Sequence, residues 1–387
     1  MLPLGVATRR SPWMTEELSA LRDLARSFCA KEIAPYRAHW EETGQVDREL
    51  WHRAGAVGLL CLSVPEQYGG GGGGIAHEAI IHEERARVGD TGWGVGVHNS
   101  VAAHYLSAYG TQEQRRRWLP RMATGDLVAA IAMTEPGAGS DLKGIRTAAV
   151  RHGDHYVVDG SKTFITNGRQ ADLIIVVVRT RPGTDRSGLS LLVVETAQAA
   201  GFSRGPALAK VGMKAQDTCP LFFDGVRVAA DNLLGGVEGQ AFAQMMQQLP
   251  RERLVVAIDC VAVMEQALAS TVEYVKQRTA FDRELIRFQN TRMKLAEAAT
   301  EVTVTRTFID ECIQRFDSGA LDDATASMAK WWASDRLGRV VDECVQLFGG
   351  YGYMTEYPIA RAFADARVQR IFGGTNELMK ELIARSL

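Results

Sequence analysis

Hydrophobic residues recur at spacings of three and four along residues 249–281, the longest helical pattern in the chain. The segment from Arg251 to Phe281 contains no glycine and no proline, and this spacing is typical of a helix with one buried face. We predict one long helix whose buried face consists of Leu254, Ala257, Val261, Met264, Leu268 and Val272. At about 1.5 Å per residue, Glu252 and Arg278 lie roughly 39 Å apart. No single small ligand spans that distance, so functional groups at both ends would serve different sites, most simply in different subunits of an oligomer.

Residues 15–127 are predicted to form an α-helical domain. Apolar stripes at helical spacing indicate helices over 18–28, 47–60, 75–88, a segment that ends at Gly110, and 112–122. Thr111 with Gln114 has the spacing of a capping box that opens the last of these helices. The six glycines at 69–74 follow no strand and precede no lysine, so a flexible connector is favoured over a phosphate-binding loop.

From residue 128 the pattern changes to the alternation typical of strands. The Asp-Gly pairs at 159–160 and 224–225 each stand between two apolar runs and are typical of hairpin turns. We predict an antiparallel β-barrel domain over 128–236. Residues 237–387 are again helical and are predicted to form a four-helix bundle. Its helices are expected over 251–281, 290–316, 322–348 and from 376 onward. The fold class is thus α+β and multidomain, with the N-terminal helical domain at 1–127.

The composition narrows the class of protein. A chain of 387 residues with a net charge of −2 and no basic run argues against nucleic acid or an anionic membrane surface as the main partner. No apolar run approaches the roughly 18 residues of a membrane span, and neither end of the chain is favoured as a targeting signal. Six scattered cysteines fit a reducing compartment and indicate neither disulfides nor a zinc site. We expect a cytoplasmic protein whose cysteines are buried.

A glycine-containing motif, residues 133–141, stands at the start of the β domain. It is not a dinucleotide fingerprint, because Leu142 occupies the place of the third glycine and Pro136 breaks the approach from strand to helix. What remains is a tight turn that offers backbone N–H groups and the hydroxyls of Thr134 and Ser140 to a polar ring and a phosphate. The alternative is a plain turn whose glycines serve only the backbone geometry.

This motif and four others resemble, in the same order, the acyl-CoA dehydrogenase family. The other four are 162–168, the spacing of Arg278, Phe281 and Gln289, 346–350, and 370–377. The resemblance covers essentially the whole chain. It implies FAD as cofactor, an acyl-CoA substrate, oxidation at Cα and Cβ to a trans-2-enoyl-CoA, a homotetramer, and reoxidation by an electron-transferring flavoprotein.

The family's binding residues carry over position by position. The implied cofactor-binding set is Met133, Thr134, Ser140, Phe164, Thr166, Arg278, Phe281, Gln289, Gln346, Gly349, Gly350, Thr375 and Glu377. The implied substrate-binding set is Ser140, Arg251, Arg253 and Gly374. Phe164 stands where tryptophan is common and would lie against the flavin ring. Arg278 and Gln289 match residues that bind the FAD of a neighbouring subunit, which agrees with the argument from helix length.

Two positions carry the predicted proton transfer. All eight histidines precede residue 156, so chemistry later in the chain needs another base. Most family members have a glutamate where this chain has Gly373; in the long-chain and isovaleryl branches the glutamate sits where this chain has Glu252. The surrounding motifs look most like the long-chain branch.

The resemblance therefore implies Glu252 as the base for the α-proton. The Gly373 N–H and a ribityl hydroxyl of FAD would donate to the thioester carbonyl. From local sequence alone, Glu252 also fits an exposed glutamate near a helix N-terminus after Pro250.

Two other functions compete with the dehydrogenase. A related flavin oxidase, of the nitroalkane or acyl-CoA oxidase type, would react directly with oxygen, but the Glu252-Arg253 pair favours the CoA enzyme. A flavin-binding homologue without turnover, associated with nucleic acid, is disfavoured by the absence of a basic patch. Acyl-chain length and branching remain open at this stage.

Overall fold

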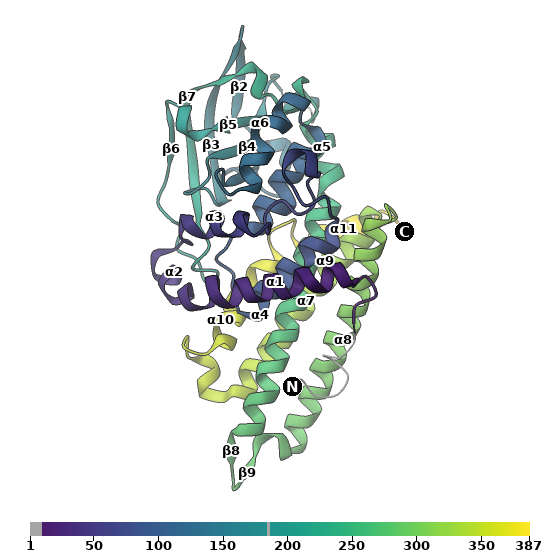
Figure 1. The fold of residues 1–387 in the computed structure, drawn as a ribbon. Helices are drawn as coiled ribbons and strands as arrows, with labels where there is room; N and C mark the ends of the chain where they lie inside the picture. The colour runs from purple at the N-terminus through teal and green to yellow at the C-terminus, as the bar shows by residue number, and fades with distance from the viewer. Residues whose placement is uncertain (1–9, 184–185) are drawn as a thin grey trace.

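The computed structural model describes residues 10–183 and 186–387. Figure 1 shows an elongated molecule with the β domain at one end, the N-terminal helices across its middle, and the long C-terminal helices running to the opposite end. The three regions follow the predicted order of helices, strands and helices.

The N-terminal domain is helical, as predicted. Its α-helices are α1 (Glu16–Phe28), α2 (Arg37–Thr43), α3 (Arg48–Ala56), α4 (Ile75–Arg87), α5 (His104–Tyr109) and α6 (Gln112–Ala123). A π-helical segment, η4 (Gly96–Ala103), runs directly into α5. The capping box of α6 is confirmed, because Thr111 accepts a hydrogen bond from the Gln114 N–H and the Gln114 side chain accepts one from the Thr111 N–H.

The glycine run is not the flexible connector that the sequence predicted. The N–H groups of Gly72 and Gly73 donate to the carbonyls of Val64 and Leu62, both at 2.9 Å. A side chain on Gly70 would collide with the Val64 carbonyl. The glycines are there because another stretch of backbone packs against them, and the segment is a hydrogen-bonded turn.

The middle domain is a sheet of seven strands. They are β1 (Ala129–Ala132), β2 (Ala148–His152), β3 (His155–Thr166), β4 (Leu173–Arg179), β5 (Leu189–Glu195), β6 (Phe202–Arg204) and β7 (Thr218–Ala229). Their order is β1-β4-β2-β3-β7-β6, with β5 beside β4. The prediction of a purely antiparallel domain was wrong in one respect, because both β1 and β2 pair with β4 in parallel. Strands β4 and β5 are buried on both faces, which explains their uninterrupted apolar sequences.

Neither Asp-Gly pair makes the predicted hairpin. Both lie inside long strands, β3 and β7, which pair with each other in antiparallel register. The register shifts between Val158 and Gly160, and the Asp159 side chain accepts a hydrogen bond from the Gly225 N–H at 2.8 Å. The Asp-Gly pairs therefore form a bulge in one long ladder, a position that also suits glycine.

The C-terminal domain is built on a helix even longer than predicted. Its elements are α7 (Ala241–Gln277), β8 (Thr279–Ala280), β9 (Arg283–Glu284), α8 (Gln289–Asp317), α9 (Asp323–Phe348), α10 (Pro358–Ala366) and α11 (Asn376–Ala384). Helix α7 contains Pro250 and begins ten residues before Arg251, so Glu252 lies well inside it and the prediction of a position near a helix N-terminus was wrong. The predicted bundle helices are present, and α10 was missed.

One described helix, α7, is long and apolar enough to cross a membrane by length and composition alone. The sequence expectation that no stretch approaches a span was therefore too strict. Its most apolar window is 61% buried inside the protein, which is typical of a core helix. Both α8 and α9 pack against it, and α4 of the N-terminal domain covers another side.

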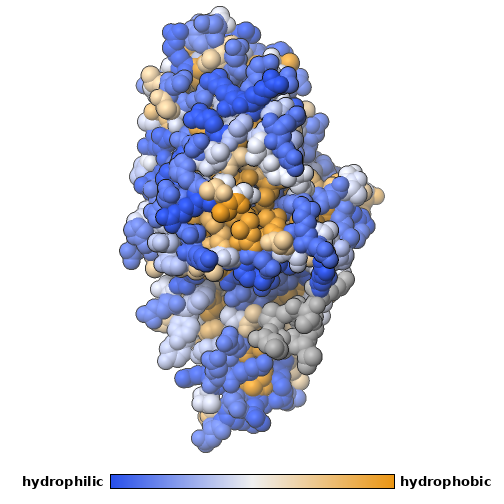
Figure 2. Space-filling view, in the orientation of Figure 1, coloured by the Kyte–Doolittle hydropathy of each residue, from blue (hydrophilic) through white to orange (hydrophobic). Residues whose placement is uncertain are grey.

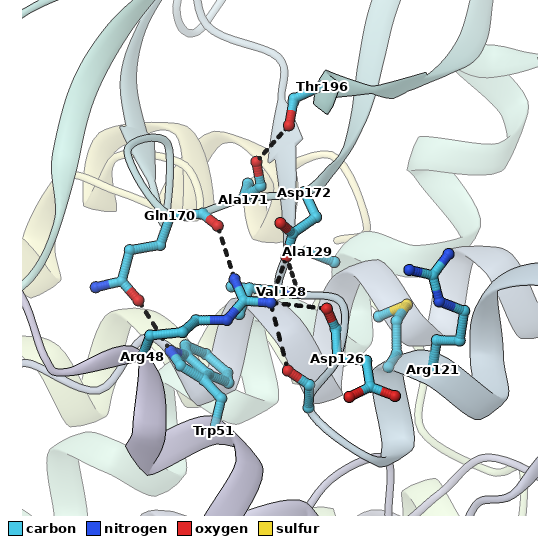
Figure 3. Close-up of polar contacts among 12 residues, drawn as sticks. Arg48, Trp51, Arg121, Asp126, Val128, Ala129, Gln170, Ala171, Asp172 and Thr196 are labelled. Carbon is cyan, nitrogen blue, oxygen red and sulfur yellow. Dashed lines mark hydrogen bonds and ion pairs between the residues drawn. The ribbon is translucent and has the colours of Figure 1, made fainter. Parts of the chain in front are cut away.

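Arg48 at the start of α3 joins the N-terminal and middle domains (Figure 3). Its guanidinium donates to the carbonyls of Gln170 at 3.1 Å and Asp126 at 2.7 Å, and pairs with the Asp172 carboxylate at 2.6 Å. Asp172 also accepts a hydrogen bond from the Val128 N–H, where the chain enters β1. This network fixes how the sheet sits on the helices.

Apolar residues gather near the middle of the face shown in Figure 2, between α3 and α1, while hydrophilic residues dominate elsewhere on that face. An apolar patch with a polar surround is typical of a surface that a ligand or partner covers.

Candidate functional site

Glu252 is a half-buried carboxylate in the middle of α7. Its Oε1 accepts a hydrogen bond of 3.1 Å from the hydroxyl of Tyr105, a buried residue of α5. Burial raises the pKa of Glu252 to about 7, against the opposing effects of the Tyr105 hydrogen bond and of Arg253. A carboxylate with a pKa near neutrality is suited to accept and release a proton.

Gly373 lies beside the same part of α7. A Cβ built on it would be 3.5 Å from Cγ2 of Val256, one turn after Glu252. Its φ of +64° and the φ of +92° at Gly374 fall in the left-handed region, which favours glycine. The structure thus brings together the two positions, 121 residues apart, that the sequence assigned to proton transfer.

A buried lysine that sequence reasoning missed holds the Gly373–Gly374 loop. Lys330 of α9 is fully buried, and its ammonium donates to the Gly374 carbonyl at 2.6 Å and to Oδ1 of Asn376 at 3.0 Å. Burial lowers its pKa to about 8. The available signal was its place on an apolar stripe of α9, made of Ala326, Ala329, Ala333 and Leu337.

Arg253 ties α7 to the same helix. Its Nη1 donates to the hydroxyl of Ser327 at 3.2 Å, one turn before Lys330 on α9. Burial lowers the pKa of Arg253, against Asp323 and Glu252, which raise it. One face of α9 therefore fixes both the helix that carries Glu252 and the loop that carries Gly373.

Arg251 has its charge satisfied inside the protein. It pairs with Glu78 of α4 at 2.6 Å and donates to the Ser63 hydroxyl and the Ser100 carbonyl. Both members of the ion pair are almost fully buried. Arg251 thus connects α7 with α4 and η4, and its contact with substrate stays a prediction.

A second buried lysine, Lys162, holds the turn at 133–139. Lys162 of β3 donates to the carbonyl of Met133 at 3.1 Å and to Oε1 of Glu135 at 2.8 Å. Glu135 accepts further hydrogen bonds from the N–H groups of Arg146 and Thr147. Burial lowers the pKa of Lys162 to about 8, against the effect of Glu135. Sequence reasoning quoted Lys162 within a motif but gave it no role.

The glycines of this turn border open space. Cβ atoms built on Gly137 and Gly139 meet nothing within 4 Å, and Ser140 is exposed. Phe164 on the neighbouring strand is 67% exposed and has a φ of +59°, which is strained for a side chain of its size. An exposed, strained aromatic next to open backbone is typical of a ligand surface. Met133 and Thr134, at the start of this turn, are partly exposed, and so is Thr166 at the end of β3.

Six other predicted cofactor residues lie at the far end of α7, as the helix-length argument expects. Arg278, Gln346, Gly349 and Gly350 line a cavity of about 580 Å³, together with Tyr274 and Tyr351. Phe281 is 89% exposed at the β8–β9 tip, and Gln289 is exposed at the start of α8. These groups are separated from Glu252 by roughly 39 Å of helix.

Thr375 and Glu377 belong instead to the loop near Glu252. Thr375 caps α11 by accepting from the Leu378 N–H, and Glu377 is exposed in the first turn of that helix. The predicted site residues therefore fall into three groups, at the middle of α7, at the mouth of the β domain, and at the far end of α7.

Comparison with known families divides the chain as the structure does. Residues 15–126 match the acyl-CoA dehydrogenase N-terminal domain, 130–226 the middle domain, and 239–387 the C-terminal domain.

Individual relatives match over nearly the whole chain. It is 47% identical to the mitochondrial long-chain specific acyl-CoA dehydrogenase of Rattus norvegicus over 375 residues, 96% of this chain and 87% of that one. An acyl-CoA dehydrogenase structure from Geobacillus kaustophilus superposes with a TM-score of 0.95 at 47% identity, covering 97% and 99% of the two chains. An acyl-CoA dehydrogenase complexed with FAD from Bacillus anthracis superposes with a TM-score of 0.91 at 30% identity, covering 98% and 68%.

Proposed function

The chain belongs to the acyl-CoA dehydrogenase family, and on that basis we propose that it oxidises a long- or branched-chain fatty acyl-CoA to the trans-2-enoyl-CoA with Glu252 as the base. It is an oxidoreductase and its cofactor is FAD. The single observation that carries the assignment of Glu252 is that a Cβ built on Gly373 would lie 3.5 Å from Val256, one turn after Glu252, whose pKa burial raises to about 7.

The residues present fit FAD at two places. The open turn at 133–139 and exposed Phe164 would hold the flavin ring, while Arg278 and the 346–350 segment would hold the cofactor of another copy. The left-handed φ of Gly349 and the open space above it suit a close approach of ligand to backbone. When bound, FAD supplies the acceptor for the hydride that leaves the β-carbon.

The protein's own contribution is proton transfer and charge stabilisation. Oε1 of Glu252 accepts the α-proton, and bound thioester would displace water and raise the pKa of the carboxylate further. The Gly373 N–H donates to the carbonyl oxygen, where enolate charge develops. Lys330 of α9 holds the loop that carries the donor, and Arg253, which bonds to Ser327 of α9, holds the helix that carries the base. Together they keep the donor and the base at a fixed separation.

We further propose a homotetramer located in the cytoplasm, with an electron-transferring flavoprotein as the acceptor. Large exposed side chains at the far end of α7, such as Phe281 and Tyr353 at 89% and 83% exposure, support a partner subunit there. Nucleic acid and membrane are not proposed partners, because the net charge is −2 and no basic run appears.

Anaerobic flavin bleaching with the Glu252→Gln variant tests the proposal. The variant should retain FAD and bind acyl-CoA but lose nearly all flavin reduction, because a neutral amide cannot accept the proton. Glu273→Gln, an exposed position on the same helix, is the control and should reduce normally. A wild-type rate in Glu252→Gln would refute the assignment. A panel of straight, branched and cyclic acyl-CoA thioesters assigns the substrate, and rapid reoxidation of the reduced enzyme by air would favour an oxidase.

A further inference from the structure

A buried ion pair packs against the turn at 133–139. Lys162 is fully buried and Glu135 almost fully, and the ammonium lies 2.8 Å from Oε1 of the carboxylate. Oε1 also accepts a hydrogen bond from the Thr147 N–H at 2.9 Å, and Oε2 accepts one from the Arg146 N–H at 2.7 Å. The two charges therefore compensate each other inside the protein, which is what a buried pair needs in order to be tolerated.

Lys162 makes one further contact that charge compensation does not require. Its ammonium also donates to the carbonyl of Met133, at the start of the turn, at 3.1 Å. Glu135 alone would compensate the charge, so this second hydrogen bond ties the ammonium to the backbone of the turn. A hydrogen bond from a charged donor is shorter and stronger than one from a neutral donor. The position of the peptide between Met133 and Thr134 therefore depends on Lys162.

The peptide that Lys162 holds carries an N–H group that is available to a ligand. A planar trans peptide directs its C=O and N–H to opposite sides, so the Thr134 N–H points away from the buried pair. No acceptor among the described residues bonds to this N–H. The next peptide is used within the protein, because the Thr134 carbonyl accepts from the Thr163 N–H at 2.9 Å and the N–H of Glu135 donates to a carbonyl of the same turn. Since Thr134 is partly exposed, its N–H remains as a donor for a bound molecule.

Strand β3 is irregular at the place where it carries both Lys162 and Phe164. Residues two positions apart in a regular strand lie on the same face. Here the pairing of β3 with β7 shifts register between Lys162 and Ile165, and Phe164 in that interval has a φ of +59°. The lysine side chain is consequently buried while the Phe164 ring is exposed. One bulge thus places a charge inside the protein and an aromatic ring on the side proposed to hold the flavin.

A hydrogen-bond donor at this place has its largest effect on a reduced flavin. A hydride brings two electrons and one proton, so a neutral flavin ring that accepts it becomes an anion. A peptide whose carbonyl already accepts a hydrogen bond is polarised, which makes its N–H a stronger donor. Such a donor stabilises an anionic acceptor more than a neutral one. Burial lowers the pKa of Lys162 to about 8, against Glu135, which raises it, so the ammonium is charged at neutral pH.

We propose that Lys162 is a positioning residue for the flavin: through the Met133 carbonyl it fixes and strengthens the Thr134 N–H as a donor to the flavin ring, and so favours the reduced over the oxidised cofactor. This inference rests on the flavin position given under the proposed function. The effect is transmitted by the peptide and not by the net charge of the pair, because Glu135 cancels that charge. The pair therefore serves hydride acceptance as well as folding.

The test compares Lys162→Met with the double variant Lys162→Met/Glu135→Gln. The single variant loses the contact with Met133 and also leaves the buried carboxylate of Glu135 without its cation. The double variant removes both charges, so the lost contact with the carbonyl is separated from the unpaired charge, and it guards against a folding failure of the single variant. Lys294→Met is the control, since this lysine of α8 pairs with Glu343 of α9 at 2.7 Å. The readouts are the dissociation constant of FAD, from titration of the apoprotein, and the midpoint potential of the bound flavin against a reference dye.

Both Lys162 variants should bind FAD about tenfold more weakly, the effect of about one lost hydrogen bond. Their midpoint potentials should be more negative than that of the wild type by about 15 mV or more, roughly a threefold change for a two-electron couple. The control should match the wild type. If the double variant regains the wild-type affinity and potential, or if neither variant changes them, the pair only compensates charge and the inference is overturned. The proposed function stands in that case as long as acyl-CoA reduces the wild-type flavin. A wild type that binds FAD but is not reduced by acyl-CoA overturns the proposed function, and the potentials, measured with a chemical reductant, still decide the inference.

Discussion

The hydrogen bond from Tyr105 to Glu252 leads to a quantitative prediction about pH. Tyr105 is buried, and burial followed by the charge of Glu252 raises the pKa of its hydroxyl, so it remains a donor throughout the working range. The hydrogen bond stabilises the ionised carboxylate and so lowers the pKa of Glu252, against burial. Replacing Tyr105 by phenylalanine removes this bond while keeping the ring in the core.

The size of the shift follows from the energy of one hydrogen bond to a charged group. Such bonds contribute about 1.5–3 kcal/mol, and one pKa unit corresponds to about 1.4 kcal/mol. Because Glu252 is only half-buried, we take the lower end, an increase of about one unit from a pKa of about 7. The ionised fraction at pH 7 then falls from about one half to about one eleventh, a roughly fivefold loss.

The assay is the pH dependence of kcat/KM for flavin reduction, which reports the free enzyme. The wild-type rate should rise with pH through about 7, because Glu252 must be ionised to accept the proton. In Tyr105→Phe the rise should move about one unit higher, with recovery at high pH. A loss of equal size at every pH, or a shift to lower pH, would refute this reasoning. Tyr109→Phe is the matched control, since Tyr109 bonds to Gln244, Gln247 and Gln248 instead.

Three further variants probe the frame around the site. Lys330→Met should leave FAD content intact but slow flavin reduction at least tenfold, because the Gly374 carbonyl loses its donor; stopped-flow reduction measures this, and an unchanged rate would contradict it. Arg48→Ala should lower stability by about 1–3 kcal/mol, measured by urea unfolding, since Arg48 joins two domains; Arg287→Ala, in an exposed local pair, should cost little. Arg278→Ala should weaken FAD binding and the oligomer together, and unchanged flavin content after gel filtration would count against that.

Sequence patterns correctly predicted the elements that depend on residues close together in the chain. The apolar stripe of α7 and the capping box at Thr111 depend on residues a few positions apart, and both are present. The Asp-Gly pairs at 159–160 and 224–225 satisfied the same kind of rule and were misassigned. Each pair lies opposite the other in a long ladder, so the decisive contact joins residues about 65 positions apart. Tertiary pairing outweighed the local turn preference.

The candidate site likewise contains residues that a sequence pattern reveals and residues whose role depends on distant partners. Glu252 and Gly373 were found because a family pattern marks both positions, and their proximity in space is a finding of the structure. Lys330 was missed because its importance comes from partners 44 and 46 residues away. A lysine on an apolar stripe was the one local sign, and it does not reveal which carbonyl the ammonium holds.

The π-helical segment η4 explains how these distant parts work as one site. Burial lowers the pKa of His98 to about 4, so its ring is neutral, with Nδ1 accepting from the Ala129 N–H and Nε2 donating to the Met122 carbonyl. This fixes the start of β1, which leads to the open turn at 133–139. Within two turns, Ser100 contacts His82 and Tyr105 contacts Glu252. Because π-helical geometry is often found at functional sites, we attribute it here to the need for one short segment to hold the β domain and the proposed base in register.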